Sequence, residues 1–138
     1  MAKTESPASP LFSISKTIRS YPRLPYEDIK DDVLGASYSL SLVFVGPDRA
    51  RSLNIKNRKK TYTPNVLSFP LDKTHGEIFI TPEIAKKEAR ARGMTQSGYI
   101  GFLFIHAVLH LKGLDHSDTM DRLEKKYCRK YNLIEGTG

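Results

Sequence analysis

The stretch that decides the fold is residues 97–116, which read SGYIGFLFIHAVLHLKGLDH. Residues 97–112 predict one long helix that is apolar on nearly every side. A helix of that kind is buried, so we expect it to form the centre of the core. Gly113 predicts the end of this helix, because glycine adopts the left-handed conformation after a helix without a steric penalty.

Three of the four histidines lie in the same stretch, at positions 106, 110 and 116. His106 and His110 are four residues apart, so on a helix they lie on one face, one turn from each other. A turn at Gly113 brings His116 back toward the same point. Three imidazoles without a fourth protein ligand are typical of an open zinc site that keeps one position for water. We therefore predict one Zn²⁺ ion per chain, held by His106, His110 and His116.

Other interpretations of this stretch stay open. One alternative is a different metal, since nickel and copper also suit imidazole ligands. Another is that the three histidines are core residues that bind no metal. Asp115 is either a residue that orients a ligand histidine or an ordinary turn residue. The remaining histidine, His75, precedes an expected strand and is predicted to lie at the surface.

The residue after the first histidine narrows the chemistry. Zinc peptidases have glutamate at that position, where it acts as the general base of their HExxH motif. Here the residue is Ala107, which accepts no proton, so the sequence disfavours peptide hydrolysis. A metal site without an adjacent base suits phosphodiester cleavage, because a cation stabilises the extra charge on the transferring phosphate.

Shorter elements flank the central helix. Apolar patterning predicts strands over residues 11–16 (at a sheet edge), 37–45, 65–69 and 76–80. Start and stop signals predict helices over about residues 25–35, 46–57, 81–92 and 118–131. Thr81 and Asp118 are the expected N-caps of the last two helices, and Ile55 is expected to face inward. Strands and helices over one core predict an α/β or α+β domain.

Length and composition favour one cytoplasmic domain over residues 1–138. The chain is 39% apolar and 27% charged, which is ordinary for a globular protein. Its one cysteine, Cys128, allows no intrachain disulfide, fits a reducing compartment and is expected to be a small core residue. No apolar run has membrane-spanning length, and we expect the polar residues 1–10 to be flexible without acting as a signal peptide.

The net charge of +7 favours a polyanionic partner. One basic group, which has no acid within it, is Arg49, Arg51, Lys56, Arg58, Lys59 and Lys60, and it is the candidate for nucleic-acid contact. A second group is Lys86, Lys87, Arg90 and Arg92. The third is Lys125, Lys126, Arg129 and Lys130, and with Glu124 beside it we interpret it as a solvated helix face.

Residues 106–116, HAVLHLKGLDH, closely resemble the HGxLHLxGYDH signature of the YbeY family of bacterial rRNA-maturation endoribonucleases. Three further segments resemble that family in the same order. Leu53 and Asn54 followed by Arg58 resemble its LN…R stretch, NVLSFP at 65–70 its TNVLSFP strand, and GEIFI at 76–80 its GDIxI strand. We take the resemblance around these four segments to extend over roughly residues 40–131.

The resemblance implies a compact α+β fold with a small mixed sheet, and zinc held by His106, His110 and His116. It implies a single-strand-specific endoribonuclease that acts in rRNA processing, including maturation of the 16S 3′ end, and in ribosome quality control. The implied partners are single-stranded rRNA and the small ribosomal subunit. The family's important arginine corresponds to Arg58, which we expect to hold the scissile phosphate, with His110 also catalytic. For Ser68 two roles are open: its hydroxyl lies near the site, or it has a purely structural role.

The sequence departs from the family pattern at three places that leave the three predicted ligands unchanged: Ala107 stands for glycine, Leu114 for tyrosine and Glu77 for aspartate. We therefore predict a zinc-dependent endoribonuclease, whose nucleophile is either a metal-activated water or a ribose 2′-hydroxyl. The alternative is a non-catalytic ribosome-assembly factor with a structural zinc site. The sequence does not determine the oligomeric state.

Overall fold

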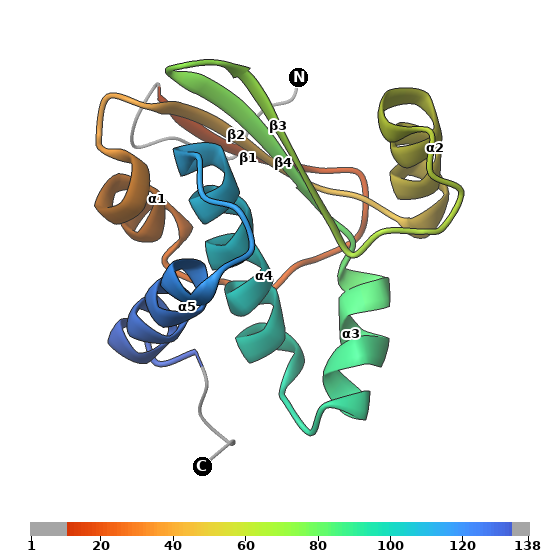
Figure 1. The fold of residues 1–138 in the computed structure, drawn as a ribbon. Coiled ribbons are helices and arrows are strands. Elements are labelled where there is room, and N and C mark those ends of the chain that lie inside the picture. The colour runs from red at the N-terminus through yellow and green to blue at the C-terminus, as the bar shows by residue number, and fades with distance from the viewer. Residues whose placement is uncertain (1–10, 134–138) are drawn as a thin grey trace.

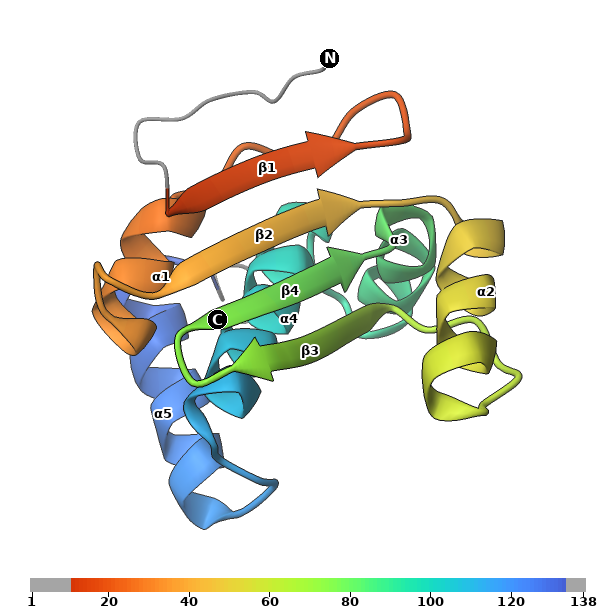
Figure 2. The same ribbon diagram turned by 90° about the horizontal axis from the view of Figure 1, so that it is seen from above.

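A mixed sheet forms one layer of the molecule, and helices pack against it (Figure 1). The computed structural model describes residues 11–133, so the expected flexibility of residues 1–10 lies outside the described part of the chain. The strands are β1 (Phe12–Lys16), β2 (Ser39–Phe44), β3 (Val66–Asp72) and β4 (His75–Ile80). Their order is β1-β2-β4-β3, with β3 antiparallel to β4 and the other neighbours parallel (Figure 2). The strand predicted for residues 11–16 is therefore an edge strand, as expected.

The helices of the described chain are α1 (Tyr26–Leu34), α2 (Pro47–Arg58), α3 (Pro82–Ala91), α4 (Gln96–Lys112) and α5 (Asp118–Lys130). In Figure 1, α4 lies beneath the sheet among α1, α3 and α5, and it contacts all three as well as β3 and β4. Helix α2 lies beside the ends of the strands (Figure 2). None of the helices within residues 11–133 is both long and apolar enough to cross a membrane. The α+β architecture with a buried central helix is confirmed.

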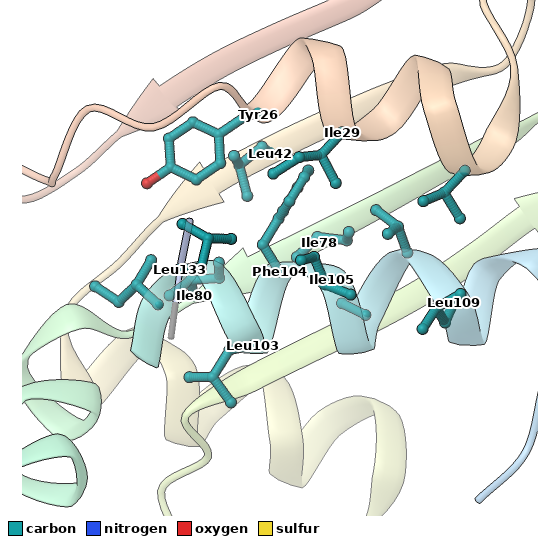
Figure 3. Packing of buried hydrophobic residues seen from close by; sticks show 14 of the residues in the cluster. Tyr26, Ile29, Leu42, Ile78, Ile80, Leu103, Phe104, Ile105, Leu109 and Leu133 are labelled. Atoms are coloured by element: carbon teal, nitrogen blue, oxygen red, sulfur yellow. The ribbon is translucent and has the colours of Figure 1, made fainter. Parts of the chain in front are cut away.

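The core lies between one face of the sheet and α4. Strand β2 alternates strictly, so that Leu40, Leu42 and Phe44 are buried and the residues between them are partly exposed. Phe104 and Ile105 of α4 are fully buried against this face (Figure 3). Each such side chain contributes roughly 1.5–3 kcal/mol to folding, which fixes α4 firmly relative to the sheet. The histidines of α4 are therefore carried by a helix that is buried in the core.

Some local predictions were wrong. Ile55 is 42% exposed, and Asn54 is buried in its place. The reason is a tertiary contact: the Asn54 amide donates to the backbone oxygen of Tyr62 at 3.0 Å, which turns that face of α2 inward. The cap of α5 is Ser117, one residue before the predicted Asp118, and its side chain accepts a hydrogen bond from Met120 N.

Two further differences concern β3 and α3. Strand β3 continues three residues past the predicted end at 69, because Pro70 and Asp72 still pair with β4 across an irregularity in the register. A connection of two residues then leads into β4. Thr81 is the N-cap residue of α3, but its side chain makes no capping hydrogen bond.

Candidate metal centre

The end of α4 brings the three histidines together. Gly113 has a left-handed φ of 109°, its N–H donates to His110 O at 2.9 Å, and the N–H of Leu114 donates to Leu109 O at 3.1 Å. These two hydrogen bonds form the reversal that commonly ends a helix at glycine. The chain turns back on α4, and one ligand atom from each of His106, His110 and His116 lies within 4.8 Å of the other two. The reversal at Gly113 therefore brings the three histidines together, as the spacing predicted.

In each of the two helical histidines, one ring nitrogen contacts an oxygen and the other faces the neighbouring histidine. Nδ1 of His110 contacts the backbone oxygen of Leu114 at 2.9 Å, and Nδ1 of His106 contacts a carboxylate oxygen of Glu124. A backbone carbonyl and a carboxylate can only accept a hydrogen bond, so in each ring Nδ1 must be the donor and must carry the proton. The two Nε2 atoms then face each other at 3.1 Å with lone pairs available for a cation.

The environment of His110 favours its neutral form. Burial and the neighbouring imidazole of His106 lower the pKa of His110 below its ordinary value. A neutral imidazole is the form that binds a metal ion. The donor set, three imidazoles with two rings held by outer oxygen acceptors, therefore fits a metal ion of the zinc type.

Glu124 is a site residue that the sequence analysis missed. It was interpreted as part of a solvated basic face, but its exposed fraction is only 8%, and it reaches His106 across eighteen positions of the chain. The periodicity of α5 could have indicated that Glu124 is buried. Met120 and Cys128 are buried on the same face, with Glu124 midway between them. The other candidate for orienting a histidine, Asp115, is exposed on the turn.

A cavity of about 650 Å³ opens beside the metal centre. The three histidines, Glu124, Arg58 and Ser68 are among the residues that line it. Arg58 comes from the last turn of α2, where its Nη1 donates to Asn54 Oδ1 at 3.4 Å and to Tyr62 Oη at 3.2 Å. The fold thus gathers the predicted site residues from α2, β3, α4 and the turn after α4 around one cavity.

His75 and Cys128 are not among the residues that line this cavity. His75 is exposed and contacts Asp72 at 2.8 Å on the sheet hairpin. Cys128 is buried, and burial together with the negative charge of Glu124 raises the pKa of its thiol to about 11. Both placements agree with the predictions of a surface histidine and a small core cysteine.

The sequence profile of the family described as "Endoribonuclease YbeY" matches residues 9–132, which is almost the whole chain. The chain belongs to the YbeY family. Among its relatives, the "Endoribonuclease YbeY" of Campylobacter jejuni is 36% identical over 102 residues, which are 68% of this chain and 76% of that protein. The protein of the same name from Neisseria meningitidis serogroup C is 34% identical over 131 residues, 87% of this chain and 75% of that protein.

A solved structure shares the YbeY fold of this chain. It is the solution structure of a protein from Thermotoga maritima, which superimposes with a TM-score of 0.63 at 23% sequence identity. The match covers 87% of this chain and 88% of the Thermotoga chain. The YbeY relatives thus support an endoribonuclease role, and the Thermotoga structure supports the fold.

Proposed function

We propose that this protein is a zinc-dependent endoribonuclease that cleaves single-stranded RNA in the cytoplasm. Its proposed substrates are rRNA precursors at the small ribosomal subunit, in processing that includes the 16S 3′ end and in ribosome quality control. The observation that carries the proposal is that Arg58 and the three clustered histidines line the same cavity. The names of the YbeY relatives support RNA cleavage, and three imidazole donors support zinc.

Each residue of the centre has its own task in this proposal. His106, His110 and His116 would hold the metal, and a zinc ion there would supply Lewis acidity, either to activate a water molecule or to stabilise the charge on the phosphate. Glu124 accepts a hydrogen bond from the Nδ1–H of His106 and so favours the tautomer whose Nε2 is free to bind the metal. The backbone oxygen of Leu114 has the same effect on His110.

Arg58 is the proposed phosphate ligand. A guanidinium presents its N–H donors in a planar fork that matches two phosphate oxygens. Within residues 11–133, the hydrogen bonds of Arg58 involve Nη1, and its charge has no acidic partner. Nη2 and Nε are therefore available for the substrate, while Asn54 and Tyr62 hold the side chain in place. Such a contact stabilises the charge that develops on the phosphate during cleavage.

A non-catalytic assembly factor with a structural zinc site is the second candidate. The basic surface and the alanine at position 107 favour it. Structural zinc sites are usually closed by four protein ligands, however, whereas these three histidines line a cavity. The cavity makes the enzyme the better supported proposal.

The deciding experiment combines elemental analysis with cleavage of an end-labelled single-stranded RNA. We expect one zinc ion per chain, and a loss of cleavage of roughly 100-fold or more in folded Arg58→Ala and His110→Ala proteins. Arg129→Ala, which removes an exposed arginine on α5, is the matched control and should cleave at the wild-type rate. A zinc-loaded wild type that leaves RNA intact would refute the proposal and favour the assembly factor.

The same assay identifies the nucleophile. A 2′,3′-cyclic phosphate on the product shows that the ribose 2′-hydroxyl attacks, which rules out direct attack by water. A 3′-hydroxyl next to a 5′-phosphate shows that water attacks. Either result is compatible with the residue roles above, because Arg58 and a metal ion held by the three histidines would stabilise the same phosphate charge on both routes.

A further inference from the structure

Three exposed cationic side chains surround a second cavity, on the segment that follows β1. Lys16, Arg19 and Arg23 line it together with Ser20 and Tyr21, and its volume is about 590 Å³. These lining residues include no acid. The ion pairs within residues 11–133 also leave the three cations without an acidic partner. A concave site with positive charge and no internal counterion is suited to an anion.

The segment that carries this cavity is well anchored. Lys16 Nζ donates to the backbone oxygen of Arg19 at 2.8 Å, which closes the turn after β1. The ring of Tyr21 stacks on Phe44 with centroids 4.3 Å apart, and Thr17 N donates to Phe44 O at 3.0 Å. The backbone is therefore held before any ligand arrives, and binding requires little ordering of the chain.

The cavity lies at the end of the sheet where α2 begins. Because β1 and β2 are parallel, the segment after β1 and the helix after β2 start at the same edge (Figure 2). Ile18 packs beside Gly46, the N-cap of α2, close enough that a methyl group on Gly46 would lie 3.7 Å from Ile18 Cγ2. The second cavity and the start of α2 are therefore neighbours at this end of the sheet.

Helix α2 connects this end of the sheet to the metal centre. Its exposed cations are Arg49, Arg51, Lys56 and Arg58, and the last of them lines the cavity of the metal centre. Asp48, in the first turn of α2, is the one acid between positions 47 and 60. The 12 residues of α2 span about 18 Å, which corresponds to about five nucleotides of a stacked single strand.

We propose that the cavity of Lys16, Arg19 and Arg23 binds a backbone phosphate of the RNA strand whose scissile phosphate lies at Arg58. The strand follows the side of α2 that carries Arg51 and Arg58, which are seven residues apart and therefore lie on the same flank of the helix, so that the two phosphate sites are about five nucleotides apart. This inference rests on the proposed function and names the path of its substrate. It predicts that long single strands bind better than short ones, by contacts remote from the metal centre.

The test compares two triple variants that lose the same charge. One is Lys16→Ala, Arg19→Ala, Arg23→Ala. The matched control is Lys125→Ala, Lys126→Ala, Arg129→Ala, which removes three exposed cations from α5, at the other end of the sheet (Figure 2). Binding of a fluorescein-labelled, 2′-O-methylated single strand of about 12 nucleotides is measured by anisotropy over a range of salt concentrations. A gel checks that this strand stays intact, and thermal unfolding checks that each variant is folded.

We expect the first triple variant to bind about tenfold or more weakly, and the slope of log K against log salt to fall in magnitude by about 0.7, the value for one phosphate contact on a single strand. The α5 control should bind close to wild type, and Asp48→Asn should bind more tightly because it removes the acid on the path. The first triple variant should also cleave an RNA of about four nucleotides at the wild-type rate, since that strand is too short to reach the second cavity.

Unchanged binding of the long strand by the first triple variant, or equal losses in both triple variants, would overturn the inference. Slower cleavage of the short RNA by that variant would do the same. If the wild type cleaves neither RNA, the proposed function fails, but the binding comparison still decides whether this cavity holds a phosphate. The two failures are thus distinguishable.

Discussion

Glu124 gives the sharpest test of how the metal centre is built. Its carboxylate is nearly buried and contacts Nδ1 of His106, while the three histidines are the proposed metal ligands. If this contact orients His106, weakening it must lower the affinity for zinc without changing the number of ligands. We compare Glu124→Gln, which keeps an oxygen acceptor and loses the charge, with Glu124→Ala, which removes the acceptor.

The expected magnitudes follow from what each variant leaves at His106. In Glu124→Ala, the Nδ1–H of a ring that is only 20% exposed loses its acceptor, which costs about 2–2.7 kcal/mol, or roughly 30- to 100-fold in zinc affinity. In Glu124→Gln, a neutral acceptor replaces a charged one, which costs about 1–1.5 kcal/mol, or roughly tenfold. Both values fall in the range observed when outer partners of ligand histidines are removed.

The assay is competition for zinc between each purified protein and a chelator of known affinity, at fixed pH. Asp121→Asn is the matched control, because it removes an exposed carboxylate from the same helix and should bind zinc as the wild type does. Chemical denaturation of the metal-free proteins shows whether any loss reflects unfolding. Wild-type zinc affinity in Glu124→Ala would refute the orienting role, and equal losses in the two Glu124 variants would show that charge contributes nothing.

Three further predictions concern the fold. Gly98→Ala should lower the free energy of unfolding by about 1–3 kcal/mol in urea denaturation, because its new Cβ would lie 2.6 Å from the backbone oxygen of Leu133. Cys128 should resist iodoacetamide at pH 8 in the native protein and react in urea, since burial raises its thiol pKa to about 11; native labelling would contradict this. A hydrogen bond from Lys130 lowers the pKa of Asp32, so this carboxylate stabilises the fold above its unfolded pKa of about 4 and ceases to do so as the pH falls through its folded pKa. Asp32→Asn should therefore flatten the acid side of a plot of unfolding midpoint against pH, and an unchanged plot would contradict this.

The elements that follow from local periodicity could be predicted from the sequence. The apolar pattern of residues 97–112 predicted α4, and the alternation of β2 predicted its buried face. The spacing of His106 and His110 put both rings on one side of α4, and Gly113 ended the helix where a left-handed residue was needed. These features depend on the periodicity of helices and strands, which is set by residues only a few positions apart in the sequence.

Contacts between distant segments could not be predicted in this way. The inward turn of Asn54 depends on the backbone of Tyr62, and the burial of Ile55 was predicted wrongly because that contact has no local signal. The strand order β1-β2-β4-β3 likewise includes the pairing of β2 with β4, two strands that are separated in the chain by α2 and β3. The periodicity of a helix or strand indicates which of its faces is buried. Which other elements that face contacts is determined only by the packing of the whole fold.

The sequence by itself therefore determined the central helix, the three clustered histidines and the family signature around them. Only the tertiary structure decided that Glu124 supports His106 and that Arg58 shares their cavity. The physical reason is distance along the chain: the histidines lie within eleven residues joined by one helix and one turn, whereas Arg58 and Glu124 lie on other helices. Their side chains reach the centre only because α2 and α5 are placed around α4 by the packing of the whole core.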